Sequence, residues 1–91
     1  MTHRMRLDEP IFCRIRIQGS LAQHWSEYLG GLSISVTGEP GHTETTLSGD
    51  ILDQAALMGV LNGLYGMGYP LLVVECQSIQ QEATEGRNEQ A

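Results

Sequence analysis

Residues 49–74 read GDILDQAALMGVLNGLYGMGYPLLVV, and this stretch predicts a helix followed by a strand, around which the rest of the chain is built. Four apolar side chains within it recur at the spacing of one helix face: Leu57, Val60, Leu61 and Leu64. The carboxylate of Asp50 or Asp53 can cap the start of this helix, and a glycine-rich turn followed by a proline closes it. The apolar run LLVV at 71–74 then predicts a largely buried strand.

A second stripe on the same helix carries almost no side chains: Ala56, Gly59, Gly63 and Gly66. Each interior glycine costs about 1 kcal/mol of helix stability relative to alanine. We expect close packing against another backbone, with the first helix of the domain as the favoured neighbour. The alternatives are the same helix of a second subunit and a weakly optimised helix.

The residues before this stretch supply a strand and a short helix. Residues 11–18 alternate apolar and polar side chains, which predicts a strand. Residues 20–23, SLAQ, have the form of a capping box, in which the serine and glutamine side chains satisfy free backbone amides. They predict a helix that starts at Leu21 and ends at Gly30-Gly31.

The middle of the chain predicts a hairpin, in which strands at 32–37 and 42–48 flank a glycine- and proline-containing turn. Its second strand should turn three side chains to the core: Thr43, Thr45 and Leu47. The resulting order is strand, helix, strand, strand, helix, strand. With right-handed crossovers, this βαββαβ order predicts an α+β ferredoxin-like plait: a four-stranded antiparallel sheet of spatial order 4-1-3-2 with two helices on one face.

The length of 91 residues is that of one domain. Residues 1–9 are polar and without a period, and are predicted to be a flexible tail. Residues 10–79 form the single plait domain. Residues 80–91 are rich in Gln and Glu, and are predicted to be a disordered polar tail.

The charge of the chain disfavours several partners. Five arginines and no lysine stand against 11 acidic residues, for a net charge of −6. An acidic domain repels DNA and anionic membranes, so no nucleic acid and no membrane partner is expected. The sequence has neither a run of apolar residues long enough to span a bilayer nor a secretory signal, which predicts a cytoplasmic protein.

The two cysteines, Cys13 and Cys76, lack the spacing of a metal site, and they indicate neither a zinc site nor a disulfide framework. If the first and last strands are antiparallel neighbours, the thiols lie nearly opposite each other on the helix-facing side. In a reducing cytoplasm, two small buried apolar side chains are favoured over a redox switch.

The uncovered face of the predicted sheet is the candidate interaction face, and by parity it carries seven notable residues: Phe12, Arg14, Arg16, Glu44, Leu71, Val73 and Glu75. Its arginines can pair with its glutamates across strands. Its apolar side chains would form a patch that invites a dimer or protein partner. A merely solvated face is the alternative, and the two interpretations carry equal weight.

Three further residues are candidates for lining a pocket: His24, Trp25 and His42. Histidine titrates near neutral pH and suits acid–base chemistry. However, the sequence offers no partner group, no nucleophile motif and no phosphate-binding loop, so no catalytic residue, cofactor or metal ligand is assigned. Surface histidines and a core tryptophan are the favoured interpretation.

The chain resembles a widespread set of small bacterial proteins of unknown function in three motifs: G-x-L-x3-W-x3-L-x-G-L-x-I from Gly19, D-Q-A-A-L-x-G-x-L from Asp53 and G-x-P-L-L-x-V from Gly68. The second motif is the most specific. Its leucine is often followed by His in that set, whereas Met58 stands here, so no role for that imidazole carries over. The resemblance implies a single-domain cytoplasmic protein and brings neither an activity nor a cofactor.

Three functions follow as hypotheses. The favoured one is a non-enzymatic interaction or regulatory module that forms a homodimer or binds a protein through the open sheet face or an edge strand. The second is a sensor of small, amino-acid-like ligands, built on the turn Gly19-Ser20-Leu21-Ala22. The third is a small dimeric plait-type enzyme with the two histidines around a cavity.

Overall fold

A computed structural model describes residues 6–79 of the chain. Six elements follow one another along it: β1 (Ile11–Gln18), η1 (Gln23–Leu29), β2 (Ser33–Glu39), β3 (His42–Ile51), α1 (Gln54–Gly66) and β4 (Leu71–Ser78). The order of strands and helices matches the order predicted from the sequence.

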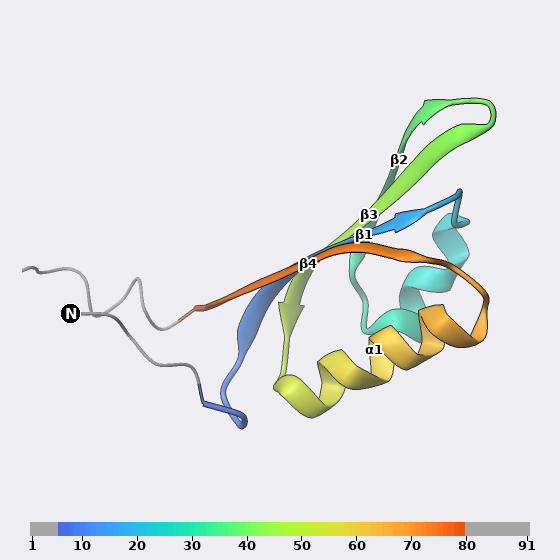
Figure 1. Cartoon of the computed structure of the whole chain (residues 1–91). Coiled ribbons are helices and arrows are strands. Elements are labelled where there is room, and N and C mark those ends of the chain that lie inside the picture. Colours follow the sequence, from blue (N-terminus) through green and yellow to red (C-terminus); the bar gives the residue numbers. More distant parts are fainter. Residues whose placement is uncertain (1–5, 80–91) are drawn as a thin grey trace, which may run out of the picture.

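The four strands form one antiparallel sheet in the order β2-β3-β1-β4, which read from its other edge is β4-β1-β3-β2. Both helices lie on the same side of this sheet (Figure 1). The core lies between the two layers, with the four apolar side chains of β1 fully buried at its centre: Ile11, Cys13, Ile15 and Ile17. A four-stranded antiparallel α+β sheet with two helices is therefore confirmed.

Helix α1 begins at an aspartate cap. The Oδ1 atom of Asp53 accepts a hydrogen bond from the Ala56 amide at 2.9 Å. Asp50, the alternative cap, lies instead in β3. The predicted apolar face is confirmed, because Leu57, Val60 and Leu64 are buried against the sheet and Leu61 packs beside them.

The first helix differs from its prediction. It is a 3-10 helix of seven residues that starts at Gln23, and its N-cap Ala22 makes no side-chain hydrogen bond. The predicted capping box is wrong, because the Gln23 side chain donates to the Ile34 carbonyl at 2.8 Å. The predicted end is confirmed by Gly30 in the left-handed conformation.

A buried threonine holds the turn that leads into η1. The Thr45 hydroxyl donates to the Gly19 carbonyl at 2.7 Å and accepts from the Leu21 amide at 3.1 Å. The Tyr69 hydroxyl donates to the Ser20 carbonyl at 2.8 Å. These hydrogen bonds hold the Gly19–Leu21 turn to β3 and to the segment before β4.

The glycine stripe of α1 meets η1 at one position. A Cβ atom built on Gly63 would lie 3.1 Å from the Leu29 side chain, whereas Gly59 and Gly66 have open space at the same place. The first helix is therefore the neighbour at Gly63, as predicted, but the contact is with a side chain of η1 and not with its backbone.

The last strand also differs from its prediction. β4 is longer than the run at 71–74 and lies at the edge of the sheet. It is not largely buried, because Leu71, Leu72 and Val74 are each more than two-fifths exposed. The prediction followed hydropathy alone, whereas an edge strand at the rim of the helix layer receives cover on one side only.

The ordered fold starts before Pro10. Leu7 accepts a hydrogen bond at its carbonyl from the Gln54 amide at 3.1 Å, and Glu9 is buried. This short turn, the last part of the predicted tail, therefore packs at the start of α1. Residues 1–5 of that tail and the predicted disordered segment 80–91 lie outside the described residues.

Candidate functional site

The open face is the side of the sheet away from the helices. Strand pairing places Arg14 opposite Ser48 on one side and Glu75 on the other, with Arg16 opposite Thr46 and Val73 in the next row. Because β2 adds Ser33 and Ser35 to these two rows, most of this face is polar. It does not form the broad apolar patch that a face-to-face interface favours.

One ion pair joins two charged residues of the open face. The Arg16 guanidinium lies 3.3 Å from a Glu44 carboxylate oxygen, as the sequence predicted for these strands. The Arg14 guanidinium lies 6.0 Å from the centre of the Phe12 ring. Both ion-pair partners are over two-fifths exposed, so the pair contributes about 0–1 kcal/mol.

A bulge changes the predicted parity at the start of β4. Between Arg16 and Ile17 the register shifts, so that Val73 lies opposite Arg16 while Leu71 lies opposite Ile17. Leu72 lines a depression of the open face beside Glu44. The structure thus places Leu72 where strict alternation had placed Leu71, because a bulge turns two neighbouring side chains to one face.

The free edge of β4 presents unpaired backbone groups. The Cα atoms of Cys13 and Cys76 lie 4.1 Å apart, the spacing of a non-hydrogen-bonded antiparallel pair. The peptide groups of Cys76 therefore point away from β1, and by alternation so do those of Val74. Within residues 6–79, β1 is the only strand that pairs with β4.

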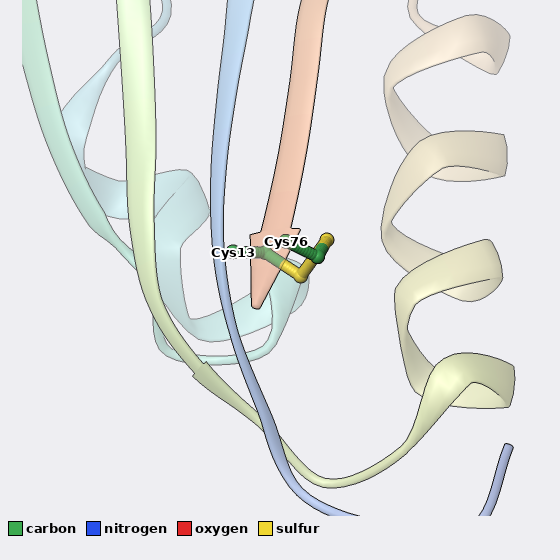
Figure 2. Close-up of a disulfide and its surroundings, with 2 residues drawn as sticks. All are labelled: Cys13 and Cys76. Carbon is green, nitrogen blue, oxygen red and sulfur yellow. A yellow bond between two sulfur atoms is a disulfide. The ribbon is translucent and has the colours of Figure 1, made fainter. Parts of the chain in front are cut away.

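An apolar helix flank lies beside this edge. Met58, Leu61 and Tyr65 follow the 3.6-residue period on the side of α1 opposite Gly63. Because Gly63 faces η1, this flank faces away from η1, and α1 itself lies on the β4 side of the sheet (Figure 2). Met58 is 53% exposed and Tyr65 is 80% exposed. We call these three residues, together with Leu71, Leu72 and Val74, the β4 edge surface.

The two cysteines form a disulfide that ties β4 to β1 (Figure 2). The predicted juxtaposition is confirmed, since Cys13 and Cys76 are direct partners in the strand register. The prediction of two free buried thiols is wrong. Both side chains extend toward α1, with Cys13 fully buried and Cys76 partly covered.

The pocket candidates do not share a cavity. His24 lies exposed on η1 with its ring centre 5.0 Å from that of Trp25, which packs against the core as predicted. His42 lies at the start of β3 and lines the open depression beside Leu72. Two histidines in separate surroundings cannot act together on one substrate.

The described part of the chain holds few features of a cofactor site. Across residues 6–79, no three His, Cys, Asp or Glu side chains gather as metal ligands. No helix in the same range is long and apolar enough to cross a membrane. Depressions along the sheet within residues 6–79 are open to solvent and contain charged or amide side chains.

Sequence reasoning missed the β4 edge surface. A signal was available, because the predicted order 4-1-3-2 puts the last strand at a sheet edge, where its four aliphatic residues lack a neighbour on one side. Helical spacing places Tyr65 and Met58 on the side of the helix adjacent to its buried apolar face. They would have been found by asking which helix flank faces that strand.

Comparison with known proteins gives a family without an assigned activity. No curated protein and no solved structure matches the chain. A family model described as a domain of unknown function (DUF8691) matches residues 12–75, from β1 into β4. Since that match spans most of the chain, the protein belongs to the DUF8691 family.

Proposed function

We propose that this protein is a non-enzymatic interaction module that binds through the free edge of β4. One observation carries the proposal: an eight-residue edge strand begins with four aliphatic residues and turns the peptide groups of Val74 and Cys76 outward. Long apolar edges are templates for another strand, and monomeric proteins usually block them with charges, prolines or bulges. β4 has Pro70 and one bulge at its start, then only Glu75 as a charge.

The mode of binding is strand addition. Backbone hydrogen bonds supply affinity in this mode, and alternate side chains supply specificity. The incoming strand comes from a second copy of the chain or from another protein. The open face, which was the candidate interaction face in the sequence analysis, supports the proposal less, because hydroxyl and charged side chains cover most of it.

The two other hypotheses lack comparable support. The turn at Gly19–Leu21 has its Gly19 amide bonded to Thr43 and its Leu21 amide bonded to Thr45. Those amides are not free to bind a carboxylate ligand, so we do not propose amino-acid sensing. The separation of the histidines likewise gives the enzyme hypothesis no catalytic pair.

The fold of this module is, we propose, a ferredoxin-like plait in which a 3-10 helix takes the place of the first α-helix.

The cytoplasmic location of the protein stays a prediction from the sequence. The disulfide bears on it, since such bonds persist in oxidising compartments and are rare in the cytosol. Rapid alkylation of the protein in its own cells should label both cysteines if the location is reducing, and neither if it is oxidising.

Replacing Val74 with proline tests the proposed function. Val74 donates outward, so Val74→Pro removes an edge donor without removing a β1–β4 hydrogen bond. We expect the wild-type chain to associate with itself or with a protein of its source cells, and Val74→Pro to lose that association with an unchanged circular dichroism spectrum. Association that survives in Val74→Pro would count against the β4 edge.

A further inference from the structure

We infer that the strand that pairs with β4 belongs to a second copy of this chain, in a two-fold dimer with one continuous eight-stranded sheet. This inference rests on the proposed function, since it names the partner of the same edge. It draws on two further observations: the apolar flank of α1 beside the edge, and the pattern of side chains along β4.

The helix flank restricts what can bind. A single strand or peptide added to β4 would cover the edge and leave Met58 and Tyr65 in water, although they are 53% and 80% exposed. A second copy adds a sheet and a helix layer together. Because a two-fold axis perpendicular to the sheet keeps both helices on the same side, the α1 flank of each copy approaches that of the other.

The residues of β4 suit antiparallel pairing with themselves. A two-fold axis at Val74 places the two Val74 residues opposite each other, where both copies turn their peptide groups outward. The same register places Val73 opposite Glu75 of the second copy. Glu75 therefore avoids its own symmetry mate, and it stays beside Arg14 of its own chain.

The opposite edge of the sheet is a poorer partner. β2 reads SISVTGE, with small polar residues at alternate positions and a glycine near its end. Pairing β4 of one copy with β2 of the next would be head-to-tail and would leave a free edge at each end, which leads to open filaments. Pairing β4 with β4 closes after two copies.

Matched substitutions at the two edges test the dimer. Val74 in β4 and Val36 in β2 are both edge-strand valines, 41% and 40% exposed. Val74→Arg sets two arginines opposite each other at the two-fold axis, whereas Val36→Arg leaves that axis untouched. Tyr65→Glu introduces a charge on the helix flank without touching the strand.

The readout is the mass of the intact protein by light scattering over a range of concentrations, with circular dichroism to confirm folding. We expect a wild-type dimer whose dissociation constant rises about tenfold or more in Val74→Arg and Tyr65→Glu and stays unchanged in Val36→Arg. A wild-type monomer overturns the inference, as does a dimer that only Val36→Arg disrupts. If the wild-type chain is a monomer but binds another protein in a way that Val74→Arg abolishes, only the dimer is wrong. If the wild-type chain shows no binding that depends on Val74, the proposed function is wrong too.

Discussion

At the scale of single residues, Thr45 is a buried polar residue that holds the turn before η1. It is fully buried, and its hydroxyl bonds two backbone groups of the Gly19–Leu21 turn. A buried amide that loses its acceptor costs about 1–3 kcal/mol. Valine has the same shape without the hydroxyl, so it isolates this effect.

We therefore expect Thr45→Val to lower the free energy of unfolding by about 1–3 kcal/mol in a urea titration. Thr46→Val is the control, because Thr46 lies on the open face of the same strand. Equal effects of the two substitutions would show that the hydroxyl does not hold the turn.

Asp53 and Asp50 provide a second residue-scale test. Only Asp53 bonds a free amide of α1, through Ala56. Asp53→Ala should lower the free energy of unfolding by about 1 kcal/mol, whereas Asp50→Ala should leave it nearly unchanged. Both variants are measured in the same urea titration. A larger loss of stability in Asp50→Ala than in Asp53→Ala would show that Asp53 is not the cap of α1.

At the scale of elements, the disulfide anchors the proposed binding strand. It closes a loop across 63 positions of sequence, and disulfides that restrict the unfolded chain in this way typically contribute roughly 2–4 kcal/mol. A reductant should lower the stability of the wild-type chain by that amount. Cys76→Ala should be less stable at the outset and insensitive to the reductant. A wild-type chain that ignores the reductant would mean that the bond does not form.

The alternating backbone of β4 gives a further prediction. Val73 pairs with Arg16 and donates toward β1, whereas Val74 donates outward. Val73→Pro removes a ladder hydrogen bond and should therefore destabilise the isolated chain by about 1–3 kcal/mol, and Val74→Pro should cost much less. Similar losses in a thermal melt would contradict the assigned direction of these peptide groups.

Elements with a regular period could be predicted from the sequence. Alternation located β1, and the spacing of Leu57, Val60 and Leu64 located α1, because each element buries one face against the core. η1 was predicted too long because the local SLAQ signal competed with a tertiary contact to Thr45. β4 was predicted buried because hydropathy does not reveal that a strand lies at an edge.

The candidate site was predicted in part for the same reason. Parity placed Arg16 beside Glu44 and brought Cys13 to Cys76. It failed at Leu71, because a bulge depends on the backbone and leaves no periodic signal. The disulfide was not predicted, because a reducing cytoplasm was expected and free thiols are favoured there. The predicted strand geometry brings the two cysteines together but does not determine whether they are oxidised.

At the scale of the whole molecule, the net charge opposes association of two copies, so the affinity of the dimer should depend on salt concentration. Each copy carries a net charge of −6, so two copies repel each other. Salt screens this repulsion over about 10 Å at 0.1 M, while apolar and backbone contacts in β4 are little weakened. The dimer should therefore tighten as sodium chloride is raised, as measured by sedimentation. Weaker association at high salt would indicate an interface built on ion pairs.

The outward peptide groups of β4 are the binding edge of the proposed dimer, and amide hydrogen exchange of the full-length chain measures them directly. If β4 pairs with a second copy, the amides of Val74 and Cys76 are protected at high protein concentration and lose protection on dilution, while the amide of Val73 stays protected throughout. If Val74 and Cys76 exchange rapidly at every concentration, the edge of β4 is free in the purified protein and the proposed dimer is wrong.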